Sequence, residues 1–161
     1  MALETLVAGA YAGAYNGVST GITEQGFELT FETKAEEIGE SDAFGESLID
    51  FIYRGGRLST MFESLAYKAG SITPFWPWGP LGVLGIIARL ASNVAMPLTL
   101  TSTAGTPAAA SPATLTFGKA ILAPNNPARL LYNSKLRKVP VRLACLPYNI
   151  GAGVIAFGSS T

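Results

Sequence analysis

Residues 26–33 read GFELTFET, and this stretch decides the fold class. The apolar residues Phe27, Leu29 and Phe31 alternate with polar ones. Because successive side chains of a strand point to opposite faces of a sheet, a period of two predicts a β-strand with one apolar and one polar face.

The residues that follow predict a loop and then a hairpin. Residues 34–46 are rich in acids, contain two glycines and show no apolar period, so we expect an exposed acidic loop. Residues 47–54 and 57–67 both resemble strands, and Gly55-Gly56 lies between them. Since glycine reaches the positive φ of a tight turn, this pattern predicts a β-hairpin that turns at the two glycines.

The remaining segments extend the same picture. Residues 9–15 predict a strand, and Asn16-Gly17 predicts the turn of a hairpin. In residues 136–146, Val139, Val141, Leu143 and Cys145 are expected to face inward. Residues 80–94 have apolar spacing that suits a helix. We therefore expect a single domain over residues 1–161 that is mainly β, with two packed sheets as a sandwich or partly closed barrel and one flanking α-helix. The tail, 158–161, is expected to be mobile.

The composition predicts that part of the surface is covered by other subunits. Only 14% of the residues are charged, whereas 48% are hydrophobic. A soluble globular domain has about 25% charged residues. We infer that some of the apolar surface contacts a partner or copies of the same chain.

The charges are divided between the two parts of the sequence. Residues 1–63 hold all eleven acids and three bases, a net charge of −8, and residues 64–161 hold eight bases and no acid, a net charge of +8. The two parts could pair within one subunit. They could also form an acidic and a basic face that stack head-to-tail.

The residues needed for common enzyme chemistry are missing. The chain has no histidine and one cysteine, Cys145. It therefore has neither a Ser-His-Asp nor a Cys-His arrangement, and one cysteine cannot supply a zinc site. No glycine-rich nucleotide motif occurs. We expect a protein that is not an enzyme and that uses no cofactor or metal.

Two clusters are candidates for contacts between subunits. The apolar residues 74–98 include prolines and glycines and are interrupted by Arg89, so we do not expect a membrane span, which needs about 20 apolar residues. Trp76 and Trp78 in this segment are expected to fill the core or to anchor an interface between subunits. The basic residues near the C-terminus lie in a neutral chain, which favours a salt-bridge surface over a nucleic-acid site. These residues are Lys135, Arg137, Lys138 and Arg142. The start of the sequence has no basic region, so we expect no signal peptide.

Several of these patterns together resemble the tail tube proteins of long-tailed bacteriophages. The similar elements are Tyr15-Asn16-Gly17, Ile49-Asp50, Tyr53, Gly55-Gly56, Phe62, Phe117, Lys119-Ala120, Val139-Pro140-Val141 and Leu146-Pro147. The resemblance covers most of the chain, and residues 74–95 depart from it by being unusually apolar.

This resemblance implies a fold shared with type VI secretion tube proteins and a structural role in the virion. Six subunits would form a ring, and stacked rings would form a hollow tail tube, made in the bacterial cytoplasm, through which DNA passes without sequence-specific binding. The partners would be copies of the chain and other tail proteins. Acids lining the tube would repel DNA phosphates, and we expect Glu28 and Glu32 to face the lumen. The residues expected to contact neighbouring subunits or rings are Glu36, Glu37, Glu40, Asp42, Arg54, Arg57, Trp76, Trp78, Lys135, Arg137, Lys138 and Arg142.

Other functions stay open at this level. The chain could be a tail terminator, a decoration protein or a baseplate protein. A membrane-active protein that uses residues 74–98, or a small β module that binds carbohydrate or nucleic acid, fits the pattern less well.

Overall fold

The computed structural model describes residues 11–38, 50–65, 89–103, 114–124 and 138–161. Most of these residues lie in strands, as the alternating patterns predict. The strands are β1 (Tyr11–Tyr15), β2 (Val18–Ser19), β3 (Glu28–Ile38), β4 (Asp50–Ser64), β5 (Met96–Ser102), β6 (Thr114–Leu122), β7 (Val139–Cys145), β8 (Tyr148–Gly151), β9 (Val154–Ala156) and β10 (Ser159–Ser160). The mainly β fold class is therefore confirmed.

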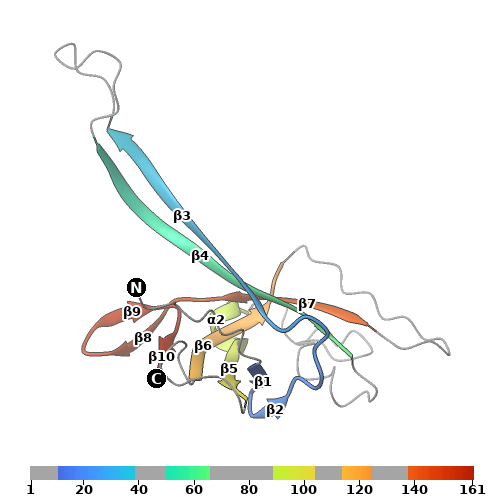
Figure 1. Ribbon diagram of the computed structural model, residues 1–161. Coiled ribbons are helices and arrows are strands. Elements are labelled where there is room, and N and C mark those ends of the chain that lie inside the picture. Colours follow the sequence, from blue (N-terminus) through green and yellow to red (C-terminus); the bar gives the residue numbers. More distant parts are fainter. Residues whose placement is uncertain (1–10, 39–49, 66–88, 104–113, 125–137) are drawn as a thin grey trace, which may run out of the picture.

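The strands form two antiparallel sheets (Figure 1). The larger sheet has eight strands. Seven follow the order β2-β1-β5-β6-β7-β4-β3, and the eighth, β10, pairs with β6. The second sheet is the hairpin β8-β9. Because β2 and β3 end the larger sheet without pairing to each other, the described strands do not close into a barrel.

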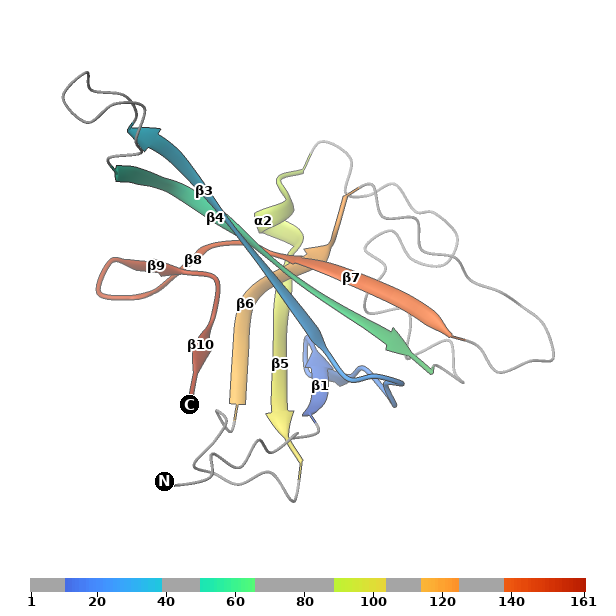
Figure 2. The ribbon, with the colours of Figure 1, turned by 45° about the horizontal axis from the view of Figure 1, so that its top comes forward.

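The hydrophobic core lies where one half of the large sheet folds over the other. Buried residues from β1, β5 and β6 contact buried residues from β4 and β7, and these are Tyr15, Leu98, Leu100, Phe117, Ala120, Phe62, Val139, Val141, Leu143 and Cys145. The inward orientation predicted for the alternate residues of β7 is confirmed. In Figure 2, β4 and β7 cross obliquely over β5 and β6.

A buried hydrogen bond ties the first strand to this core. The Tyr15 hydroxyl donates to the carbonyl oxygen of Ala120 at 3.0 Å. The turn predicted at Asn16-Gly17 is also present, because both residues have positive φ (49° and 76°) between β1 and β2. The burial around Tyr15 raises the pKa of its hydroxyl.

The hairpin predicted at Gly55-Gly56 is wrong. Both glycines lie inside the single strand β4, which pairs with β3 from Asp50 to Met61. The register shifts between Lys34 and Ala35, where Gly55 has a φ of 123°. Glycine adopts this φ readily, and here it serves a β-bulge instead of a turn.

Three further predictions need correction. The expected acidic loop is a strand over its first part, since β3 continues to Ile38; residues 39–46 lie outside the described part. Of the predicted helix, residues 89 and 90 are not helical, only Ala91–Val94 (α2) is, and residues 80–88 lie outside the described part. The C-terminal residues expected to be mobile are paired, because β10 joins β6 and Thr161 exchanges two backbone hydrogen bonds of 3.0 Å with Thr114.

The hairpin of β3 and β4 extends far beyond the body of the molecule (Figure 1). Strand β4 pairs with β7 only from Leu58 to Ser64. From Asp50 to Arg57 its partner among the described strands is β3 alone. We call this projecting part of the hairpin, residues 32–38 and 50–57, the arm.

Candidate assembly surface

The arm is amphipathic, and its apolar face continues the face that forms the core. Cross-strand partners share a face of a sheet. Phe31 is paired with Leu58, whose side chain packs against the core, and further along the arm Ala35 is paired with Tyr53 and Glu37 with Phe51. The core-facing side of the sheet therefore leads into the aromatic residues of the arm.

These aromatic side chains are exposed although they lie on the core-facing side. Phe31 is 60% exposed and Tyr53 is 66% exposed. The rings of Phe51 and Tyr53 meet edge to face with their centroids 5.4 Å apart. Isolated exposed apolar residues are common in proteins, but a row along one face marks an interaction surface.

The bulge is what places the two aromatic rings on this face. Without the register shift, the alternation that includes Leu58 and Gly56 would continue to Arg54 and Ile52. The shift moves Tyr53 and Phe51 to that face instead, opposite Ala35 and Glu37. A turn at the two glycines, as predicted from the sequence, would not form this apolar face.

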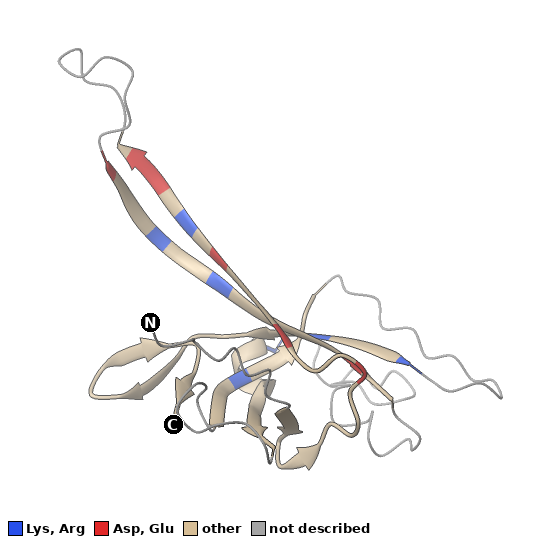
Figure 3. Cartoon of the chain, in the orientation of Figure 1, with Lys and Arg blue, Asp and Glu red and all other residues tan. Residues whose placement is uncertain are grey.

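The opposite face of the arm is mostly polar. It carries Glu32, Lys34 and Glu36 from β3, and Arg57 is paired directly with Glu32. Glu28 and Thr30 lie on the same face of β3, nearer the body. Arg54 at the bulge forms an ion pair with Glu36. Figure 3 shows that charged residues follow β3 and β4, whereas β1, β2, β5 and β8–β10 carry none.

The residues predicted to make contacts between subunits are distributed over several places. Glu37 lies on the apolar face of the arm, and Glu36 and Arg54 pair with each other. Arg57 and Arg142 line one cavity, described below. Glu40, Asp42, Trp76, Trp78, Lys135 and Arg137 lie outside the described residues.

Lys138, which the sequence analysis assigns to a contact with a neighbouring ring, has a partner in its own chain. Its ammonium donates a hydrogen bond of 2.6 Å to the carboxylate of Glu24. This hydrogen bond lowers the pKa of Glu24 and raises the pKa of Lys138. The pair supports the view that the acidic and basic parts of the sequence interact within one subunit, at least at this position.

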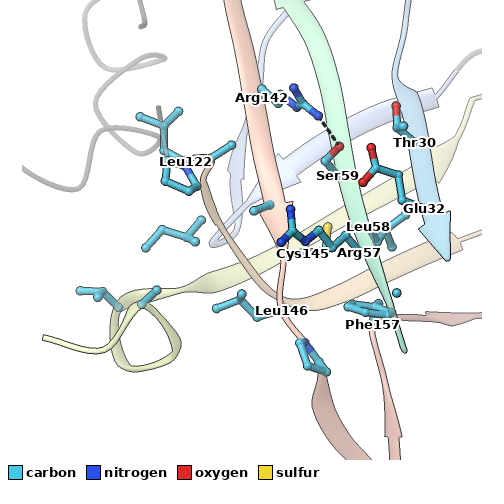
Figure 4. Close-up of a pocket in the computed structure, with 18 of the residues that line it drawn as sticks. Thr30, Glu32, Arg57, Leu58, Ser59, Leu122, Arg142, Cys145, Leu146 and Phe157 are labelled. Atoms are coloured by element: carbon cyan, nitrogen blue, oxygen red, sulfur yellow. Dashed lines mark hydrogen bonds between the residues drawn. The ribbon is translucent and has the colours of Figure 1, made fainter. Parts of the chain in front are cut away.

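A cavity of about 1030 Å³ opens beside the base of the arm. It is bordered by β3, β4, β7, α2 and residues 121–124. Three of its lining residues are arginines, Arg57, Arg89 and Arg142, and one is an acid, Glu32. Figure 4 shows Arg142 directed toward Ser59, to which it donates a hydrogen bond of 3.4 Å. Arg89 and the other two arginines are far apart in the chain, so no local sequence pattern indicates that they line one cavity.

The comparisons with known proteins give no family. No model of a known protein family matches the chain, and no curated protein is significantly similar to it. In the described part of the chain, no helix has the length and apolar character needed to cross a membrane. The described residues also contain no cluster of three or more acidic or cysteine side chains that could hold a metal ion.

Proposed function

We propose that the protein is a structural subunit that joins copies of itself into a hollow tube, as its resemblance to phage tail tube proteins implies. The observation that supports this proposal most directly is the apolar face of the arm. Phe31, Phe51 and Tyr53 continue the core-facing side of the sheet beyond the body and remain exposed in the single chain. Burial of these side chains against another subunit is favourable by about 25 cal/mol per Å² of apolar surface.

The unpaired edge of β3 also supports self-association. Strand β3 has eleven residues, and among the described strands its only partner is β4. Exposed edges of this length pair readily with other chains unless they are covered. Burial of the arm in an assembly removes both the exposed edge and the exposed aromatic rings from water.

In the proposed assembly, six subunits form each ring, the rings stack, and DNA passes through the bore of a virion tail. Glu28 is the residue that we propose for the lumen. Glu32 is less suited to repel phosphate, because Arg57 lies directly opposite it on β4.

Electron microscopy of the purified full-length protein tests this function. Hollow filaments of uniform diameter are the expected result. A tail terminator, a decoration protein or a baseplate protein would not form such long hollow filaments. A compact monomer that persists at high concentration would contradict the proposal, as would absence of the protein from assembled phage particles.

A further inference from the structure

The cavity at the base of the arm combines an apolar interior with a basic border. Its apolar lining includes Val94, Leu122, Leu146 and Phe157. Arg57, Arg89 and Arg142 also line it, and all three arginines are exposed. A site of this kind suits a ligand that has both apolar and anionic groups.

The positive charge of this cavity is not balanced within the described part of the chain. The two ion pairs found there join Arg54 to Glu36 and Lys138 to Glu24, so neither involves an arginine of the cavity. Glu32 is the single acid in the lining, which leaves a net charge of +2. An acidic partner would therefore gain favourable electrostatic interactions there.

The chain itself contains a segment with the complementary chemistry. Residues 39–49, GESDAFGESLI, hold three acids, Glu40, Asp42 and Glu46, and no base. The apolar Phe44 lies among them. This segment connects Ile38 and Asp50, which are paired at the far end of the arm.

The paired end of the arm, Ile38 and Asp50, lies away from the cavity of the same subunit. Glu32 lines the cavity, and Ile38 lies six residues further along the same strand. At about 3.3 Å per residue this separation is about 20 Å. The arm also points away from the body (Figure 1). The direction of the arm therefore favours a segment from another subunit.

We propose that the cavity bordered by Arg57, Arg89 and Arg142 receives residues 39–49 of a second copy of the chain. This inference rests on the proposed self-assembly and names the contact that carries it. The two surfaces differ, so the contact is heterologous and each subunit can both give an arm and receive one. Repetition of this contact extends a ring or a filament.

Charge reversal on each side tests the contact. The cavity variant is Arg89→Glu with Arg142→Glu, and the segment variant is Glu40→Lys with Asp42→Lys and Glu46→Lys. Each variant alone should fail to assemble in sedimentation and electron microscopy. An equimolar mixture should assemble again, because each subunit then meets a partner of opposite charge. Recovery in the mixture also shows that both variants are folded. Lys138→Glu is the matched control, since it reverses the charge of one residue near Arg142 but outside the cavity, and it should assemble.

A peptide of residues 38–50 separates this inference from the proposed function. We expect it to bind the full-length wild-type protein in a salt-dependent manner and to bind the cavity variant at least about tenfold more weakly. If the wild-type protein stays monomeric and still binds the peptide, the tube proposal fails and the cavity assignment stands. Normal assembly of the cavity variant, a mixture that does not recover, or equal loss of assembly in the Lys138→Glu control would overturn the inference.

Discussion

Phe31 of β3 contacts Phe157, which lies 126 residues away in the sequence, edge to face with ring centroids 6.1 Å apart. Phe157 follows β9 and precedes β10, and β10 is paired with β6. The contact therefore joins the base of the arm to the C-terminal part of the body. It adds a side-chain contact to the pairing of β4 with β7, which begins at Leu58.

A double-mutant cycle on Phe31→Ala and Phe157→Ala should show coupling between the two rings. An aromatic pair contributes about 0.5–1.5 kcal/mol beyond the area that it buries, and the exposure of Phe31 favours the lower end of this range. Urea denaturation of the two single variants and the double variant measures the coupling. Strictly additive losses of the free energy of unfolding would show that the contact has no energetic role.

Replacement of Tyr53 by serine should weaken assembly and leave the subunit stable. Tyr53 is largely exposed, so we expect the free energy of unfolding to change by about 0.5 kcal/mol or less. The matched control is Ile52→Ser, which removes an exposed apolar side chain from the opposite face of the arm. Sedimentation velocity should detect a larger loss of assembly for Tyr53→Ser. Equal effects of the two variants would contradict the role of the apolar face.

Replacement of Gly55 by alanine should loosen the arm without unfolding the body. A non-glycine residue at a φ of 123° costs about 1–3 kcal/mol. Hydrogen exchange should become faster for the amides of the arm and stay unchanged for β5 and β6. Thr33→Ala on the partner strand serves as the control. Unchanged exchange in the arm of the Gly55→Ala variant would show that the bulge is not strained by a side chain.

The pair of Glu24 and Lys138 should make a small, pH-dependent contribution to stability. The pKa of Glu24 is lower in the folded chain, so this contribution is present above the ordinary glutamate pKa and is lost as the pH falls through the folded value. Carboxyl NMR titration should show that the pKa of Glu24 rises in the Lys138→Gln variant. Arg142→Gln should leave the pKa of Glu24 unchanged, and a similar rise in that control would argue against a specific pair.

The thiol of Cys145 should be unreactive in the folded protein. Burial raises its pKa to about 11 from 9.0, so its thiolate is about a hundredfold less abundant at pH 8 than that of an ordinary cysteine. The thiol loses its proton at a lower pH in the unfolded chain than in the folded chain. The free energy of unfolding should therefore decrease as the pH rises from about 9 to about 11. Alkylation at pH 8 should be slow in buffer and fast in urea. Rapid alkylation of the native protein would contradict the buried position of Cys145.

The local patterns of the sequence were sufficient to predict the strand class and the orientation of single strands. The alternation in residues 26–33 and 139–145 indicates which side chains share a face, and Asn16-Gly17 indicates a tight turn. These features depend on the chain's own backbone geometry and on neighbours one or two residues away, so they can be read without knowledge of the partner strand.

Only the tertiary structure decided that Gly55 and Gly56 lie at a β-bulge, and that Arg57 shares a cavity with two other arginines. A pair of glycines permits either a turn or a bulge, and the choice depends on which residues of β3 are opposite. The cavity likewise unites Arg57, Arg89 and Arg142 from distant parts of the chain. Register and long-range pairing arise from the packing of whole strands against a common core, and no local pattern contains that information.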